Sequence, residues 1–298
     1  MASNAPARRD GSTTANWIGV DWGTTNLRTW LLDRDDRVRD EATSERGMST
    51  LRPDEFEDTF LELVEPWLDT AATPMPTIAC GMVGARGGWI EAPYARVPLR
   101  TRQRRHGNRR PDARPTTRLP RARCISQDTP PDVMRGEETQ LLGEVQAFRT
   151  CLSGELFALL STASVLRHSI ATEGWDADAY AAALPDALGN PGALPATLFG
   201  LRASTLLADA DPVCARARLS ALLIGAKLAT MRHWWEGAEV VLVGAKALVD
   251  RYRVALVTGG GASRTLDADL LTLAGLASSR RQLSPDLTII PHPPRGNP

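Results

Sequence analysis

The stretch from Ile18 to Asp33, IGVDWGTTNLRTWLLD, constrains the fold of this chain more than any other. Apolar residues alternate on both sides of Gly23-Thr24-Thr25-Asn26, which predicts two short strands joined by a tight turn. A glycine beside small hydroxyl residues leaves amide and hydroxyl groups free to face a phosphate. Asp21 stands just before the turn, where one carboxylate could hold a hydrated Mg²⁺. An ordinary hairpin with a solvated Asp21 is the alternative.

The composition argues against several classes of protein. With 298 residues the chain can form two lobes, and its 35 basic and 35 acidic residues give no net charge that would attract nucleic acid or a membrane surface. It has no apolar run long enough to span a membrane and no signal peptide, so we expect a cytoplasmic protein. Its four cysteines form no CxxC pair, which argues against a zinc site or a disulfide framework.

The order of the expected elements predicts a mixed α/β domain followed by a mostly helical half. The first part should contain strands at 17–21, 27–33 and 38–43, an amphipathic helix opened by Pro53, and a buried strand at 76–81 that ends in the glycine-rich GMVGARGGW. The second part should contain helices at 136–142, 153–168, 176–188, 197–208, 213–235 and 266–277, and a strand at 240–243 followed by a helix through Leu256. We expect Ser153 to cap the helix at 153–168, whose apolar stripe includes Leu156 and Leu159.

The segment from 96 to 123 differs abruptly from both of its neighbours. It is rich in arginine, carries one acid and has almost no apolar residues able to pack. A nucleic-acid arm is one interpretation, but the segment has no aromatic residues for stacking. We favour a disordered insertion or a stretch that is out of frame relative to a once-folded segment.

Five blocks together resemble one family: GVDWGTTNLRTW, IACGMVGARGGWIEAPYARVP, DVMRGEETQLLG, CLSGELFALLSTASVLRHS and LFGLRA. The chain is similar to the 2-dehydro-3-deoxygalactonokinases, sugar-acid kinases of the superfamily that contains actin and hexokinase. The resemblance implies an α/β protein with two ribonuclease-H-like, actin-like lobes, and ATP and Mg²⁺ in a cleft between them. It also implies γ-phosphoryl transfer to the C6 hydroxyl of 2-dehydro-3-deoxy-D-galactonate, in galactonate breakdown.

The resemblance implies a role for each polar block. Asp21 would hold Mg²⁺ and act in catalysis, while Gly23, Thr24 and Thr25 would surround the phosphates. Glu137 and Glu138 are the candidates for the general base. Adjacent helical residues point about 100° apart, so we expect only one of them to face the cleft, and we choose Glu137. Carboxylates at a helix start also favour the positive end of the helix dipole, which is the structural alternative.

The remaining candidates concern the sugar acid and the nucleotide. Arg86 is the first choice for the substrate carboxylate, because arginine binds carboxylates bidentately. The other substrate candidates are Arg28, Arg135, Trp89, Glu91 and Tyr94. VVLVGAKAL resembles the adenosine motif of these kinases and implicates Gly244 and Ala245, although a plain strand-to-helix connection fits it nearly as well.

The expected domains are a disordered tail at 1–15, an N-terminal lobe at 16–135 with an irregular insertion at 99–123, a helix-rich lobe at 136–280 and a loose tail at 281–298.

Two departures from the family stand out. The arginine-rich insertion is one, and the apparent deletion after Gly143 of a strand and a second phosphate loop is the other. Losing that loop predicts severely reduced turnover, since one preorganised donor alone is worth about 10²- to 10³-fold. A catalytically degenerate protein that binds a sugar acid or nucleotide is therefore the alternative function. Long apolar helices leave room for a homodimer face.

Overall fold

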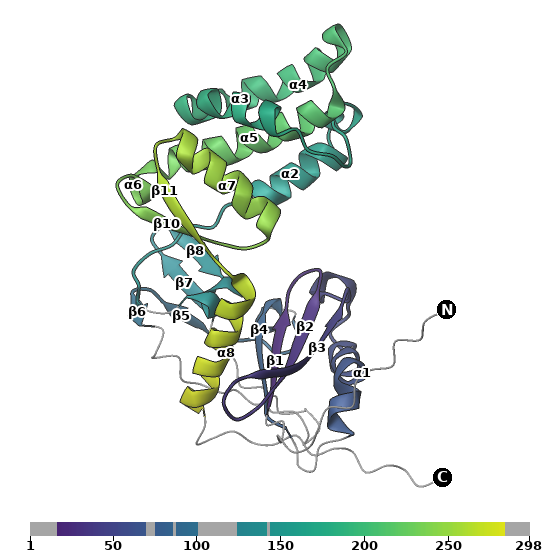
Figure 1. Cartoon of the computed structure of the whole chain (residues 1–298). Coiled ribbons are helices and arrows are strands. Elements are labelled where there is room, and N and C mark those ends of the chain that lie inside the picture. The colour runs from purple at the N-terminus through teal and green to yellow at the C-terminus, as the bar shows by residue number, and fades with distance from the viewer. Residues whose placement is uncertain (1–16, 70–74, 86–87, 101–123, 142–143, 284–298) are drawn as a thin grey trace, which may run out of the picture. The chain divides into compact units, whose positions relative to one another are not determined.

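The computed structural model describes residues 17–69, 75–85, 88–100, 124–141 and 144–283 (Figure 1). The expected N-terminal tail, residues 284–298 of the expected C-terminal tail and most of the arginine-rich segment lie outside these residues, whereas residues 281–283, expected in that tail, end a helix. The described chain is mixed α/β and divides into two compact units. Unit 1 contains residues 1–149 and 269–298, and unit 2 contains residues 150–268.

Unit 1 is organised around a four-stranded sheet in the order β3-β2-β1-β4. The strands β1 (Trp17–Trp22), β2 (Leu27–Leu32) and β3 (Val38–Ser44) form an antiparallel meander, and β4 (Thr77–Gly81) lies parallel to β1. The predicted positions of all four strands are therefore confirmed to within one residue at most of their ends. The register places Asp21 opposite Arg28 across the hairpin, and opposite Cys80 on β4.

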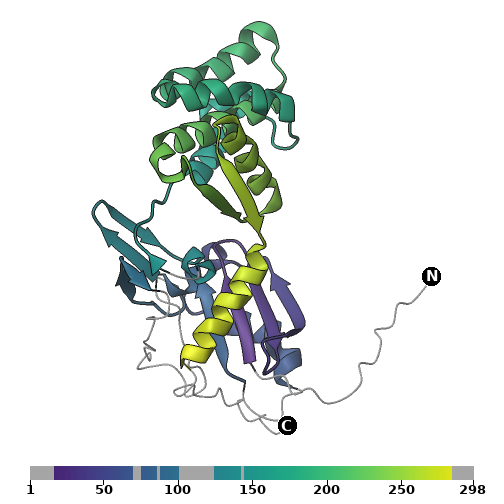
Figure 2. The same cartoon turned by 60° about the vertical axis from the view of Figure 1, so that its left-hand side comes forward.

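One helix covers each face of this sheet. On one face, α1 (Phe56–Leu68) buries Phe56, Phe60 and Val64 against residues of β1. On the other face, α8 (Ala268–Leu283) buries Leu276 and Ala277 against Trp17, Trp30, Leu32, Ile78 and Cys80. Figures 1 and 2 show α8 running along the sheet. Burial on both faces explains why β1 and β4 are almost continuously apolar.

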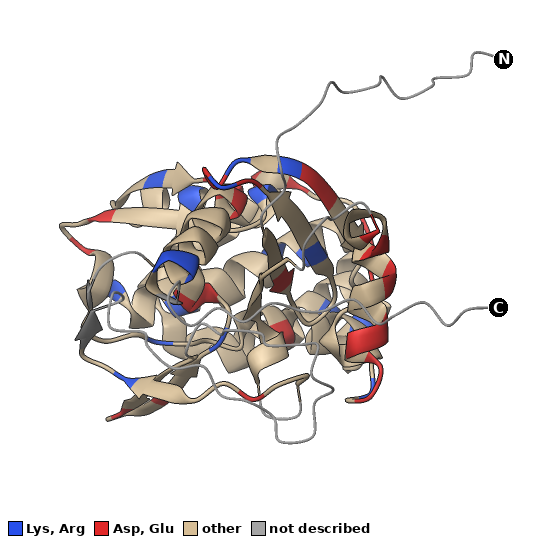
Figure 3. Ribbon diagram, turned by 90° about the horizontal axis from the view of Figure 1, so that it is seen from below, with Lys and Arg blue, Asp and Glu red and all other residues tan. Residues whose placement is uncertain are grey.

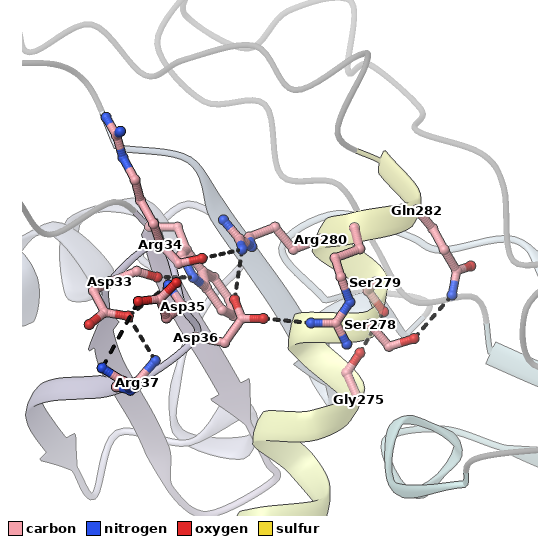
Figure 4. A network of polar contacts seen from close by, with 12 residues as sticks. Asp33, Arg34, Asp35, Asp36, Arg37, Gly275, Ser278, Ser279, Arg280 and Gln282 are labelled. Atoms are coloured by element: carbon pink, nitrogen blue, oxygen red, sulfur yellow. Dashed lines mark hydrogen bonds and ion pairs between the residues drawn. The ribbon is translucent and has the colours of Figure 1, made fainter.

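The end of α8 is held to the β2–β3 turn by charge (Figure 4). The Asp36 carboxylate forms an ion pair with Arg280 at 2.9 Å and accepts from Arg281 at 2.6 Å. Arg280 also donates to the Arg34 carbonyl oxygen at 3.0 Å, and its guanidinium lies 5.3 Å from the centre of the Trp17 ring. Because Arg280 and Asp36 are both less than a fifth exposed, solvent screens this pair weakly.

Shorter elements complete unit 1. A three-stranded sheet has the order β5-β7-β8, and a two-stranded ladder pairs β6 with β9. The bounds of these strands are β5 (Tyr94–Arg96), β6 (Leu99–Arg100), β7 (Cys124–Asp128), β8 (Pro131–Met134) and β9 (Glu144–Val145). The 3₁₀ turns near the candidate site are η1 (Met48–Thr50), η2 (Met82–Gly84) and η4 (Glu137–Gln140).

Unit 2 consists of helices packed around α5 (Pro212–Thr230), whose small residues Ala215, Ala217 and Ala221 are buried. A parallel pair of strands, β10 and β11, is joined by the crossover helix α7. The other elements and their bounds are α2 (Ser153–Thr162), η5 (Val165–His168), α3 (Ala177–Gly189), η6 (Pro191–Ala193), α4 (Leu194–Ala208), α6 (Arg232–Trp235), β10 (Glu239–Val243), α7 (Lys246–Thr258) and β11 (Ala262–Leu266).

The β10–β11 pair is unusually open for a parallel sheet. Every residue of the two strands is at least partly exposed, and Val241 is 41% exposed. Parallel sheets normally have both faces covered. The pair therefore has the character of an incomplete sheet.

Several predicted boundaries need correction. The segment 136–142 forms only the 3₁₀ turn η4 (Glu137–Gln140): Gly136, with a φ of 107°, precedes it, and the backbone is already extended again at Leu141 (φ −90°, ψ 113°). The helix expected at 153–168 ends at Thr162, its N-cap is Leu152 without a side-chain cap, and α2 has no buried residue among those expected in its stripe. The division between the units falls after Arg149 rather than after 135, because β9 pairs with β6, and α8 returns to unit 1.

Acidic and basic residues are interspersed along the described elements (Figure 3). Among the residues that the structure describes, no helix combines the length and the apolar character needed to cross a bilayer. The cysteines Cys80, Cys124, Cys151 and Cys214 are all free thiols.

Candidate functional site

The turn between β1 and β2 presents unpaired amide groups. The Gly23 N–H donates to the Asn26 carbonyl oxygen at 2.9 Å and closes the turn. Thr24 and Thr25 are exposed, and the hydrogen bonds found among the described residues leave their backbone N–H groups unpaired. The turn borders a pocket of about 500 Å³ lined by Asp21, Gly23, Thr25, Asn26, Arg28, Thr43, Ser44 and Glu45. Successive amides that face an open pocket are suited to bind an anion.

A second loop supports this turn from behind. The N–H groups of Met48 and Ser49 donate to the carbonyl oxygens of Gly23 and Thr24, each at 3.0 Å. Gly47 permits the close approach, since a Cβ there would lie 2.2 to 2.4 Å from backbone atoms of Thr24 and Thr25. The loop thus fixes the carbonyl side of the turn and leaves its amide side open. No local pattern indicates a role for Gly47, because the contact joins segments that are more than 20 residues apart.

We expect Gly47→Ala to move the Thr24–Thr25 turn and to lower kcat/KM for the nucleotide by about 10²-fold, since a displacement of about 1 Å can cost that much. The backbone of Gly47 is extended, so alanine is excluded there by the clash alone. Steady-state kinetics with varied nucleotide would measure the effect. Gly154→Ala is the matched control, because a Cβ at Gly154 meets no atom within 4 Å. Equal kinetics in the two variants would show that the turn does not hold the nucleotide.

Asp21 lies at the end of β1 and is paired with a cation. Its Oδ2 is 2.6 Å from Nη2 of Arg28. The other Nη of Arg28 contacts Asp269, in the first turn of α8. Burial opposes the charge of Arg28, but the bonds to these two carboxylates outweigh it and raise the pKa of the guanidinium. Asp269 was missed from the sequence, because only the return of α8 to the sheet brings it to Arg28.

The two adjacent glutamates face different surroundings. Glu138 is 2% exposed, and its Oε2 accepts from the Gly136 N–H. Glu137 is exposed. Gly136 packs on Gly81, where a Cβ on Gly136 would lie 3.3 Å from the Gly81 Cα, and a Cβ on Gly81 would lie 3.1 Å from Oδ1 of Asp21. The turn η4 therefore sits against the end of β4, close to Asp21.

The thiol of Cys80 lies among these carboxylates. Its Sγ is 3.8 Å from Oδ1 of Asp21. Burial, followed by the charges of Asp21 and Glu138, raises the pKa of Cys80 well above its usual value. Burial and then the charge of Glu138 raise the pKa of Cys124 to about 12. Both thiols stay neutral at physiological pH, so they add no further negative charge beside the carboxylates.

The sugar-acid candidates are not gathered in one place by the described contacts. Arg86 lies outside the described residues. Trp89 is 7% exposed and packs edge-on against Trp22 at 5.9 Å, which favours a role in the core. Glu91 and Tyr94 are exposed, and Arg135 is half-buried near Cys124. Arg28 is the one candidate in direct contact with Asp21 among the described residues.

Gly244 and Ala245 lie in unit 2, at the junction between β10 and α7. Gly244 has a φ of 147°, and a Cβ there would meet no atom within 4 Å. Both residues are exposed. The junction therefore leaves room for a ligand beside the start of α7, and its role stays a prediction.

The donor set near the turn suits a weakly coordinated, hydrated cation. Among the described residues, no group of three or more His, Cys, Asp or Glu side chains could hold a metal ion. Magnesium is held by one or two carboxylates together with water and phosphate oxygens. Asp21 already accommodates a cationic group, the Arg28 guanidinium, so its surroundings fit such an ion.

Comparisons with known proteins agree with one another. A family model described as 2-keto-3-deoxy-galactonokinase matches residues 21–146 and 142–279. The curated Probable 2-dehydro-3-deoxygalactonokinase DgoK1 of Rhizobium meliloti (strain 1021) is 32% identical over 312 residues, covering 92% of this chain and 99% of the relative. The 2-dehydro-3-deoxygalactonokinase of Escherichia coli (strain K12) is 31% identical over 291 residues, covering 89% and 97%.

A solved structure extends the similarity to the fold. A crystal structure described as that of a 2-dehydro-3-deoxygalactonokinase protein from Sinorhizobium meliloti superposes with a TM-score of 0.80 at 31% identity, covering 90% of this chain and 99% of that one. The family match itself falls in two pieces that meet at residues 142–146. The alignment with the first relative has 312 positions, which is more than the number of residues in 92% of this 298-residue chain. This chain therefore carries gaps against its relative.

Proposed function

Because the chain belongs to the 2-keto-3-deoxy-galactonokinase family, we propose that it transfers the γ-phosphoryl group of ATP to the C6 hydroxyl of 2-dehydro-3-deoxy-D-galactonate. The product would be 2-dehydro-3-deoxy-6-phosphogalactonate. The single observation that carries the proposal is the β1–β2 turn: the backbone N–H groups of Thr24 and Thr25 have no partner among the described residues, and Thr25 and Asp21 line the same pocket. Phosphoryl transfer depends on such positioning and charge stabilisation more than on covalent chemistry.

Different residues at and near the turn would bind the phosphates, hold the metal ion and accept the proton. The amides and hydroxyls of Thr24 and Thr25 would donate to phosphate oxygens, and Gly47 behind them would keep these donors in place. Asp21 would hold Mg²⁺ through water, and the ion when bound would neutralise charge on the phosphates. Glu137, exposed on η4, would accept the proton of the attacking hydroxyl.

The two units support an assignment as two ribonuclease-H-like lobes of the actin-like superfamily. Unit 1 has an antiparallel meander extended by a parallel strand, with a helix on each face. Unit 2 has a parallel pair with a crossover helix. In this proposal the glycine junction at Gly244 and Ala245 would contact the adenosine.

A second candidate function is binding of the sugar acid or the nucleotide without turnover. Two observations favour it: the family match is broken at residues 142–146, and the β10–β11 sheet is open to solvent. A segment missing from unit 2 would remove contacts that matter in the transition state more than in the ground state.

A coupled assay of ADP release, with purified chain and a panel of sugar acids, separates the two candidates. We expect turnover with 2-dehydro-3-deoxygalactonate that falls to background in Asp21→Ala. Asp54→Ala is the control, because its carboxylate is 77% exposed and does not line the pocket beside the turn. A ligand-induced rise in melting temperature without turnover would support the second candidate. Turnover that persists unchanged in Asp21→Ala would overturn the proposed site.

A further inference from the structure

One guanidinium bridges two carboxylates from distant parts of the sequence. Arg28 on β2 contacts Asp21 on β1 through Nη2 and Asp269 on α8 through Nη1. Its guanidinium also lies 5.4 Å from the centre of the Trp30 ring. Two carboxylates this close to each other would repel without the cation between them. Arg28 therefore acts as their shared counter-ion.

In this arrangement Arg28 competes with a metal ion for the carboxylate of Asp21. Oδ2 of Asp21 already accepts from Arg28 at 2.6 Å, and Oδ1 faces the neutral thiol of Cys80. A divalent ion that approached Asp21 would repel the guanidinium. The contact between Asp21 and Arg28 must therefore open when the ion arrives.

The carboxylate of Asp269 lowers the free energy needed to separate Arg28 from Asp21. An arginine released from its only partner would leave a partly buried charge unpaired, which is costly. Arg28 is 33% exposed and is already bonded to Asp269, so it loses only half of its pairing. The fixed start of α8 keeps Asp269 within reach, because Leu276 and Ala277 anchor the helix on the same sheet.

We propose that Arg28 is a resident counter-ion of Asp21, and that Asp269 is a positioning residue that retains Arg28 when magnesium and nucleotide take Asp21. The proposal rests on the proposed function for the identity of the ligand. It also makes Arg28 unsuited to bind the carboxylate of the sugar acid, since its guanidinium already serves two carboxylates.

The test is binding rather than turnover: calorimetric titration of the full chain with Mg²⁺ and a non-hydrolysable ATP analogue. Asp269→Asn leaves Arg28 with Asp21 alone, so we expect the analogue to bind about fivefold more weakly. Arg28→Met removes the competing cation, so we expect binding about fivefold tighter. In the double variant the effect of Asp269→Asn should vanish, because Asp269 acts through Arg28.

Arg28→Lys provides a second variant in case Arg28→Met does not fold. A lysine keeps one charge but has no planar fork to bridge two carboxylates, so Asp269→Asn should have less effect in that background. Equal effects of Asp269→Asn with and without Arg28, or no effect at all, would overturn the proposal. If turnover were lost in Asp21→Ala, but Asp269→Asn left the affinity for the ATP analogue unchanged, only this inference would be refuted. If the variants changed the affinity for the ATP analogue as expected, but the chain had no turnover with any sugar acid, only the proposed reaction would be refuted.

Discussion

Replacing Glu137 with glutamine is expected to lower kcat by about 10²- to 10⁴-fold, with little change in KM for ATP, because general-base catalysis contributes about that much. Glutamine keeps the size and the hydrogen-bonding capacity of the side chain but cannot accept the proton of the attacking hydroxyl. Since Glu137 is exposed on η4, its replacement should leave the stability of unit 1 unchanged. Steady-state kinetics together with thermal unfolding of the variant would measure both quantities.

The neighbouring glutamate supplies a matched control. Glu138→Gln makes the same chemical change one residue later, at a side chain that is 2% exposed and accepts from the Gly136 N–H. Weakening that bond should cost about 1–3 kcal/mol of unfolding free energy, which lowers Tm by roughly 2–4 °C per kcal/mol in a protein of this size. If Glu138→Gln lost kcat without losing stability, while Glu137→Gln stayed active, the general base would be Glu138.

Gly275→Ala is expected to destabilise the protein by at least about 2 kcal/mol, at the upper part of the range for overpacked cores. A Cβ at Gly275 would lie 1.9 Å from the Thr139 carbonyl oxygen and 2.8 Å from its Cγ2. A backbone carbonyl cannot rotate away as a side chain can, so α8 or η4 must shift. Because α8 carries Asp269 and η4 carries Glu137, the shift should lower activity as well. Urea unfolding would measure the loss of stability.

Gly200→Ala is the helical control for that substitution. Gly200 lies within α4, and a Cβ there meets no atom within 4 Å. Alanine should stabilise this helix by about 0.5–1 kcal/mol, because glycine has more backbone entropy to lose. If the two variants shifted the urea midpoint in the same direction, the contact between Gly275 and Thr139 would not hold α8 in place.

Local patterns predicted the first sheet well. Strands β1, β2 and β4 and helix α1 each have a clear apolar pattern: β1 and β4 are nearly continuous apolar runs buried on both faces, and α1 buries the residues that recur at helical spacing. Strand β11 was missed: residues 262–265 were assigned to no element, and only Leu266 was placed at the start of a helix. Its sequence ASRTL has one large apolar residue, since the strand is partly exposed throughout.

The early end of α2 has a local cause that apolar spacing does not reveal. The hydroxyls of Ser161, Thr162 and Ser164 donate to the carbonyl oxygens of Phe157, Ala158 and Leu160. The Ser164 hydroxyl also accepts from the Leu166 N–H at 3.0 Å and caps the next turn. Such hydroxyls compete with the helical hydrogen bonds of the backbone.

The site itself was only half predictable. Asp21 and the glycine turn are adjacent in the sequence, so their pattern indicated their chemistry directly. Asp269, Gly47 and Gly275 act across long separations in the chain, through the return of α8 and the approach of two loops. No local pattern encodes such contacts, because each of these residues alone is an ordinary helical or loop residue.

The two-sided covering of the β3-β2-β1-β4 sheet has a consequence for synthesis on the ribosome. One face is covered by α1, which is made early, but the other waits for α8, which is translated only after all of unit 2. Until then Trp17, Trp30 and Leu32 have no helix over them. The nascent sheet therefore exposes an apolar surface of the kind that chaperones bind. Unit 1 can complete its fold only after all of unit 2 has been synthesised.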